Sequence, residues 1–214
     1  KAPTWLRAPA PIEAGATRYA APTSLVPGEA PIIPPFGPDT ADRLKRGRLI
    51  HALLERLPEL APEARETAAR DFLAHDISLS EARRDEILTV THAVLNDPAF
   101  EQVFAPGGRA EAAIIGTAPE LPDGMIINGR IDRLVITETE ILIVDFKTDR
   151  PAPAEASNIG ASYLAQMAAY RAVLRRAWPN RTVRCALLWT DGPKLMPLPD
   201  ALLDDAITSL RAEV

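Results

Sequence analysis

Hydrophobic and polar residues follow a helical pattern in the first half of the chain. Apolar residues recur at helical spacing up to about residue 57, and Asp39 or Thr40 can cap this helix. A second helix is predicted to begin at Pro62, a residue favoured in the first turn, and to end near residue 75. Ser78, followed by Glu81, is typical of the capping box that begins a third helix, which we expect to reach about residue 96.

The pattern changes after this helical part, residues 39–105. β-Branched and partly alternating runs, separated by Pro, Gly and Asp, predict strands over 110–117, 125–136, 140–148 and 182–190, with a short strand after Gly192. Helices are predicted over 157–178 and from Asp200 onward. This order predicts an α/β fold in which helices flank a central mixed β-sheet, so we expect residues 106–214 to form an α/β core.

Proline is concentrated at the start of the chain, because residues 1–38 hold nine of the 21 prolines. Proline favours extended backbone, so we expect this segment to be a linker or an arm that lies on a neighbouring surface. Apolar residues that could anchor it are Trp5, Leu6, Ile32, Ile33 and Phe36. Because the chain begins with Lys1 rather than Met, we expect it to be a fragment or a processed product.

Composition excludes several classes of protein. Hydrophobic residues make up 47% of the 214 residues, and no apolar run approaches the roughly 20 residues that cross a bilayer. The single cysteine, Cys185, rules out a disulfide framework and an iron–sulfur cluster held by four thiolates of this chain. Without a signal segment at the start, we expect a cytoplasmic protein. The net charge of −5 is unusual for a nucleic-acid-binding protein, although bound divalent ions would reverse the charge of an acidic site.

Two carboxylates and a lysine stand out in the predicted strands. Asp145 and Lys147 are separated by one residue, so on a strand they point the same way, while Phe146 points to the opposite face. Asp132 lies near the end of the preceding strand, and a hairpin turn around 137–139 would set it close to Asp145. Two such carboxylates repel, and a divalent ion such as Mg²⁺ would compensate. Lys147 could then orient or help deprotonate an attacking water and stabilise a pentavalent phosphate.

An ordinary surface hairpin is the alternative explanation of these charges. It accounts easily for Asp132. It accounts poorly for Asp145 and Lys147, because they follow four apolar residues, 141–144, in the strand that we expect to be the most buried. Burial of such a pair costs desolvation energy unless the pair has a function or a tight partner. The spacing alone leaves both explanations open.

Five segments taken together resemble the RecB-like nucleases of the PD-(D/E)XK superfamily. They are Gly47–His51, Glu111, Gly129–Asp132, Asp145–Thr148 and Gln166–Tyr170, in that order. Over residues 43–190 the chain most closely resembles the C-terminal nuclease domain of the AddA helicase–nuclease subunit of bacteria. The resemblance implies a restriction-endonuclease-like core with an N-terminal helical subdomain. Relatives with an iron–sulfur cluster carry four cysteines, so the single cysteine favours the AddA type.

The resemblance also implies roles for individual residues. The metal ligands would be His51, Asp132, Asp145 and the backbone carbonyl of Phe146, and Lys147 would be the catalytic lysine. Gln166 and Tyr170, one helical turn apart, are similar to the family's Gln-x-x-x-Tyr motif and would contact DNA or the lysine as further catalytic residues. Ordinary helix packing is the alternative for both. Glu111 resembles the family's leading acidic residue, and an exposed charge at a strand edge explains it equally well.

His51 is weighed separately, because a lone histidine on the apolar face of a helix is more often packed than ligating. Gly47 lies one turn earlier on the same face, and an interior helical glycine, which costs up to about 1 kcal/mol, indicates a close neighbour. With the resemblance, ligation is the preferred interpretation. The best candidates for phosphate contacts, which a solvated helix face would also explain, are Arg43, Lys45, Arg46 and Arg48.

The expected function is Mg²⁺-dependent DNA hydrolysis by an exonuclease of double-strand-break repair and recombination, with Mn²⁺ able to substitute. In the AddA type, a motor domain would deliver single strands and an AddB-type subunit would be the partner. The sequence has no P-loop motif, so we expect no ATP site, no iron–sulfur cluster and no membrane association in this fragment. The alternatives are a catalytically silent nuclease fold that binds DNA or a partner subunit, and a purely structural module.

Overall fold

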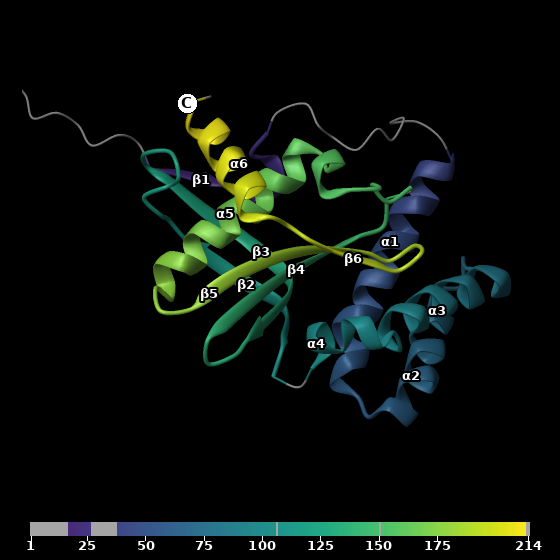
Figure 1. Ribbon diagram of the computed structural model, residues 1–214. Coiled ribbons are helices and arrows are strands. Elements are labelled where there is room, and N and C mark those ends of the chain that lie inside the picture. Colours follow the sequence, from purple (N-terminus) through teal and green to yellow (C-terminus); the bar gives the residue numbers. More distant parts are fainter. Residues whose placement is uncertain (1–16, 27–37, 106, 150, 213–214) are drawn as a thin grey trace, which may run out of the picture.

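The computed structural model describes residues 17–26, 38–105, 107–149 and 151–212, and it contains a mixed sheet with helices on both faces (Figure 1). The strands are β1 (Arg18–Ala20), β2 (Arg109–Gly116), β3 (Met125–Ile136), β4 (Glu140–Lys147), β5 (Thr182–Trp189) and β6 (Lys194–Pro197). The α-helices are α1 (Pro38–Arg56), α2 (Pro62–Ala74), α3 (Glu81–Leu95), α4 (Glu101–Phe104), α5 (Ala161–Ala177) and α6 (Asp200–Ala212). The predicted α/β fold with a central mixed sheet is confirmed.

The sheet opens along one edge of β3. The strand order is β1-β3-β4-β5-β6, and β2 also pairs with β3. β2 covers residues 127–134 of β3, whereas β4 covers 133–136 and β1 covers 125–127. Because both β1 and β4 overlap β2 along β3, they must share the edge opposite β2. Residues 128–132 therefore face a gap between β1 and β4 on that edge.

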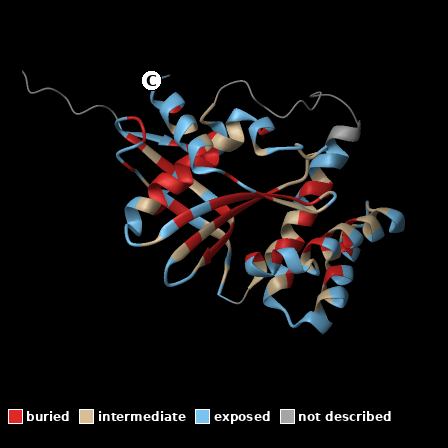
Figure 2. Ribbon diagram, viewed as in Figure 1, coloured by how far each residue is buried: buried red, intermediate tan, exposed pale blue. Residues whose placement is uncertain are grey.

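Two hydrophobic cores lie on the two faces of the sheet. Side chains of β4 alternate between them, with Ile141 and Ile143 on the side of α5 and α6 and with Val144 and Phe146 on the side of α1 to α4. Figure 2 shows the buried residues concentrated in β4, β5 and the middle of α5. This double burial explains why β4 reads as an almost continuous apolar run. None of the helices in the described part of the chain is long and apolar enough to cross a membrane.

Three predicted helix starts, those of α1, α3 and α5, are wrong. Ser80, not Ser78, caps α3, because its side chain accepts a hydrogen bond from the Arg83 amide at 3.3 Å. Ser78 lies in the preceding turn, where its hydroxyl donates to Asp76 at 2.8 Å. Helix α5 begins at Ala161 rather than at residue 157, because residues 156–158 form a separate 3₁₀ turn.

Helix α1 begins at Pro38, so Asp39 and Thr40 lie within its first turn and not at a capping position. Proline is favoured in the first turn because it has no backbone N–H, and an N–H at that position would have no partner within the helix.

Part of the proline-rich segment joins the sheet. β1 pairs in parallel with β3, and the 3₁₀ turn η2 (Pro22–Ser24) that follows contacts α5. Pro22 is buried. The residues proposed as anchors, Trp5, Leu6, Ile32, Ile33 and Phe36, lie outside the described residues.

Candidate active site

The gap in the sheet brings the two predicted carboxylates together. Arg133 pairs with Val144, so the next positions along the hairpin, Asp132 and Asp145, fall opposite each other. The amide of Phe146 donates to Asp132 Oδ2 at 2.7 Å. The Asp132 side chain thus takes the place of a backbone acceptor where the two strands separate. The register expected from the hairpin is confirmed.

Tyr170 fills the gap from the side of α5. Its hydroxyl donates to the Arg130 carbonyl oxygen at 2.7 Å and accepts from the Arg130 amide at 3.3 Å. A Cβ atom at Gly129 would lie 2.9 Å from the same hydroxyl and 2.8 Å from Pro22, which explains the glycine at this strand position. Burial raises the pKa of Tyr170 to about 12. Tyr170 therefore supports β3 as a neutral hydrogen-bonding group two residues before Asp132.

Lys147 and Gln166 hold the carboxylate of Asp145. Lys147 Nζ lies 2.7 Å from Asp145 Oδ2, and Gln166 Nε2 donates to Asp145 Oδ1 at 2.8 Å. Gln166 Oε1 is in turn 3.5 Å from Lys147 Nζ. Asp145 and Gln166 are buried, each with only 4% of its surface exposed. The strand places Asp145 and Lys147 on one face, as predicted, and Phe146 packs in the core on the other face.

Tyr163 and Asp149 complete the surroundings of Lys147, and the sequence analysis did not identify either of them. Lys147 Nζ lies 3.7 Å from the centre of the Tyr163 ring, and the Tyr163 hydroxyl donates to the Asp149 carboxylate. Tyr163 stands three residues before Gln166 on α5, so the two face the same way. That spacing was the signal available in the sequence.

Helix α1 brings His51 to the same site. His51 Nδ1 lies 3.7 Å from Asp132 Oδ2, and the ring meets Phe146 edge-on at 5.7 Å. One turn earlier, a Cβ atom at Gly47 would lie 2.8 Å from Thr148 Oγ1. The glycine therefore lets α1 approach the end of β4 closely enough for His51 to reach Asp132, although ligation by His51 stays a prediction.

Burial and charge conflict in this site. Burial raises the pKa of Asp132 well above its usual range, and the nearby Asp145 carboxylate raises it further. Burial also lowers the pKa of His51, an effect that Asp145 and a hydrogen bond to the Phe146 backbone partly offset. The raised pKa of Asp132 and the lowered pKa of His51 both show that the protein alone compensates charges at this site incompletely.

Glu111 lies beside Asp132 on the other edge of β3. Ala110 pairs with Arg133 and Ala112 with Ile131, so Glu111 falls opposite Asp132. Its φ of 48° is in the left-handed region, which is strained for a residue with a side chain. Its carboxylate lies 3.5 Å from Arg130 and contributes to the raised pKa of Asp132. The structure thus brings Glu111 next to the site.

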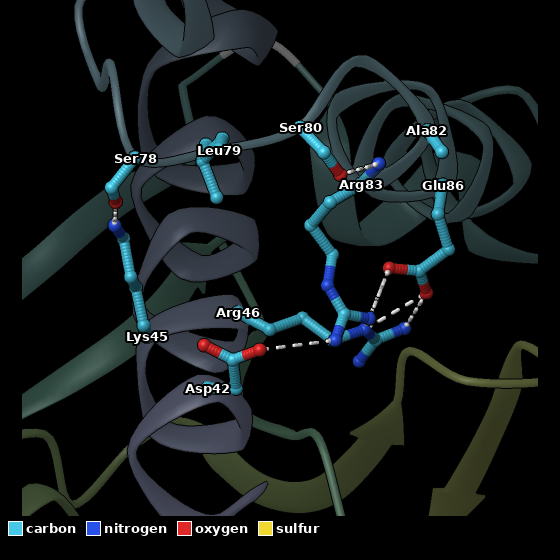
Figure 3. A pocket seen from close by; sticks show the side chains of 9 residues that line it. All are labelled: Asp42, Lys45, Arg46, Ser78, Leu79, Ser80, Ala82, Arg83 and Glu86. Carbon is cyan, nitrogen blue, oxygen red and sulfur yellow. Dashed lines mark hydrogen bonds and ion pairs between the residues drawn. The ribbon is translucent and has the colours of Figure 1, made fainter. Parts of the chain in front are cut away.

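Two of the basic residues predicted to contact phosphate, Lys45 and Arg46, have acidic partners within the protein. They line a pocket of about 480 Å³ between α1 and α3 (Figure 3). Arg46 is buried and makes three hydrogen bonds to Glu86, one of them at 2.6 Å, and Lys45 lies 2.7 Å from Asp76. These contacts attach α1 to α3 and to the turn before it. Arg46 is therefore held inside the fold, contrary to the phosphate prediction, whereas phosphate contact by Lys45 and by the exposed Arg43 and Arg48 stays a prediction.

The donor atoms at the gap are of the kinds that bind divalent ions, namely an imidazole and two carboxylates. Within the described residues, however, no three His, Cys, Asp or Glu side chains stand in an arrangement that would hold an ion. Lys147 and Gln166 occupy both oxygens of Asp145. A divalent ion would compete with these partners for Asp145, and it would supply the positive charge that Asp132 lacks.

Comparison with known proteins assigns the family. The model of the PD-(D/E)XK nuclease superfamily matches residues 29–201, which include every site residue described above. The chain belongs to the PD-(D/E)XK nuclease superfamily. This PD-(D/E)XK chain is also similar to a solved structure described as that of SSO0001, with 15% identity and a TM-score of 0.32 over 81% of this chain and 86% of that chain. No curated protein matches. Nuclease activity, a divalent metal ion and a DNA substrate are the general properties that this membership indicates.

Proposed function

We propose that the site at the point where β3 and β4 separate hydrolyses phosphodiester bonds of DNA with the help of Mg²⁺, for which Mn²⁺ can substitute. One observation carries this proposal: Asp132 and Asp145 lie opposite each other where the strands separate, with Lys147 2.7 Å from Asp145. Nonfunctional charges would avoid such a buried position, because two neighbouring carboxylates repel.

Four groups would hold the ion: His51, Asp132, Asp145 and the carbonyl of Phe146. When bound, the ion would polarise the phosphate and lower the pKa of a water ligand. Lys147 would orient the attacking water and stabilise charge on the phosphate oxygens. Gln166 would hold Asp145 and Lys147 in their relative orientation, and Tyr170 would support the strand that carries Asp132. Glu111 would add a negative charge next to Asp132.

At a finer level, we infer an AddA-type helicase–nuclease as the parent protein. It would act as an exonuclease in double-strand-break repair and recombination in the cytoplasm. A motor domain would deliver single strands, and an AddB-type subunit would be the partner. The ordered set of motifs supports this inference. Cys185 also supports it, since a lone thiol cannot form a four-cysteine cluster and burial raises its pKa to about 12.

Cleavage of labelled DNA tests the proposal. Single- and double-stranded oligonucleotides labelled at the 5′ or the 3′ end would be incubated with the protein in Mg²⁺, Mn²⁺, Ca²⁺ or EDTA. We expect cleavage of single strands in Mg²⁺ and Mn²⁺, none in EDTA, and products that shorten from one end. Binding of DNA without cleavage in any metal would contradict the proposal and favour a silent nuclease fold. Internally cut products would support nuclease activity but contradict the assignment as an exonuclease.

A further inference from the structure

Three groups surround the Lys147 ammonium. Asp145 Oδ2 lies 2.7 Å and Gln166 Oε1 3.5 Å from Nζ, and the face of the Tyr163 ring covers a third side at 3.7 Å. Only 11% of the Lys147 side chain is exposed. The ammonium has three N–H donors, so two oxygens and one ring face fit it without leaving a donor directed at the protein interior.

The Tyr163 ring is itself held from two directions. It stands on α5 three residues before Gln166, so α5 presents the ring and the amide together. Its hydroxyl donates to Asp149, which lies two residues beyond Lys147 after the end of β4. The ring is thereby held both by α5, which carries it, and by the segment that follows β4.

We propose that Tyr163 is a positioning residue for Lys147 and that Asp149 holds the Tyr163 ring in place. This inference rests on the proposed function. A lysine side chain has four rotatable bonds, and an ammonium that moves among rotamers would lose the orientation on which its action at the phosphate depends. The ring attracts the cation and excludes water from one side of it. Because a ring face accepts no proton, it does so without neutralising the lysine.

Steady-state cleavage of a single-stranded oligonucleotide separates positioning from packing and from DNA binding. Tyr163→Leu removes the ring, and we expect kcat to fall about tenfold while KM stays within about twofold. Tyr163→Phe keeps the ring, and we expect it to restore kcat to within about threefold of the unmodified protein. Leu164→Ala is the control for helix packing, because Leu164 is the neighbouring residue on α5 and packs against the core. We expect it to leave kcat unchanged.

Chemical labelling of lysine amines gives a readout that needs no cleavage. The protein would be treated with an amine-acylating reagent at one pH, and the labelling rate of each lysine would be measured by peptide mass spectrometry. We expect Tyr163→Leu to raise the rate at Lys147 severalfold, with Lys45 and Lys194 as internal references. Leu164→Ala should leave it unchanged. Tyr163→Phe, which keeps the ring but loses the bond to Asp149, should raise it no more than Asp149→Ala does. If the unmodified protein cleaves no DNA, the proposed function fails, and the labelling rates alone decide the role of Tyr163.

The overturning results are distinct. A rise in KM without a fall in kcat would make Tyr163 a DNA contact, and equal losses in Tyr163→Phe and Tyr163→Leu would assign the effect to the hydroxyl. An unchanged labelling rate in Tyr163→Leu would also overturn the proposal. If Tyr163→Leu does not fold, Asp149→Ala decides the question. Asp149→Ala should raise the labelling rate of Lys147 in the otherwise unmodified protein. In Tyr163→Phe it should cause no further rise, and additive effects of the two substitutions would contradict the proposed link between Asp149 and the ring.

Discussion

Ionisation of Asp132 lowers the stability of the protein when no metal ion is bound. Its carboxylate is partly buried, faces Asp145 and Glu111, and accepts a hydrogen bond from the Phe146 amide. Its pKa is raised, so the folded protein binds this proton more tightly than the unfolded chain does. The stability contributed by the protonated form is present at low pH and is lost as the pH rises through the raised pKa.

Asp132→Asn should therefore stabilise the protein in EDTA at neutral pH while it abolishes cleavage. The amide keeps an acceptor for Phe146 and removes the charge. We expect the melting temperature to rise by about 2–4 °C at pH 7.5, as about 1 kcal/mol would give in a protein of this size. The gain should shrink as the pH falls toward 3.8, the usual pKa of an aspartate.

Thermal melts over a pH series measure this difference, with Asp205→Asn on the exposed side of α6 as the control. Addition of Mg²⁺ should stabilise the unmodified protein and not Asp132→Asn. An asparagine variant that is less stable than the unmodified protein in EDTA at pH 7.5 would contradict the account of Asp132.

His51→Ala tests the ligand that comes from a different part of the chain. Imidazole is a softer ligand than carboxylate, so its removal should weaken Mn²⁺ binding more than Mg²⁺ binding, by about 10- to 100-fold for Mn²⁺. Calorimetric titration of each metal measures the affinities, and excess metal should partly restore cleavage. His75→Ala is the matched control, because His75 is exposed and bonds to a carbonyl of α2. Equal affinities in His51→Ala and the unmodified protein would exclude ligation.

Helix α5 is the element that shapes the site. It presents Tyr163 and Gln166 to Lys147 and Asp145, and one turn later Tyr170 to the open edge of β3. Residues 165–174 of this helix are buried, so Gln166 and Tyr170 have little freedom to move. Helix α5 thereby holds Asp145 and Lys147 of β4 in place and also fills the gap beside Asp132.

Tyr170→Phe should weaken the element that bridges the gap. The substitution leaves the Arg130 carbonyl and amide without the hydroxyl that both contact, which costs about 1–3 kcal/mol in unfolding free energy. Because Asp132 is two residues away, we also expect a severalfold fall in kcat. Denaturant unfolding and a cleavage assay measure the two effects. Tyr19→Phe, at an exposed hydroxyl on β1, is the control, and a Tyr170→Phe protein as stable as that control would refute the bridging role.

The sequence predicted the strands and the pairing of Asp132 with Asp145 because both depend on local spacing. A turn of three residues sets the register of the β3–β4 hairpin, and alternation sets the face of Lys147. The contacts of Arg46 with Glu86, and of Tyr163 with Asp149, depend on how helices pack on the sheet. No periodicity encodes that packing. The fate of Arg46 was therefore predicted wrongly, and the role of Tyr163 was not predicted.

Three arginines of the described residues are used inside the fold. Arg46, Arg133 and Arg171 are buried, and each has an acidic partner within the fold. Asp and Glu outnumber Lys and Arg, 29 to 24, so the net charge of −5 disfavours binding to the phosphates of DNA. We therefore expect weak binding of DNA by this chain alone. Activity should accordingly be measured at low salt and with excess protein.

The most direct test of the account is Mg²⁺-dependent cleavage of single-stranded DNA by Asp145→Asn and Glu140→Gln under those conditions. Both substitutions remove one negative charge from β4, but Glu140 pairs with Arg184 at the far end of the strand. We predict that Asp145→Asn lowers the cleavage rate by at least about a thousandfold without loss of folded structure. Glu140→Gln should cleave at the normal rate. Comparable cleavage by Asp145→Asn and Glu140→Gln would contradict the assignment of the site.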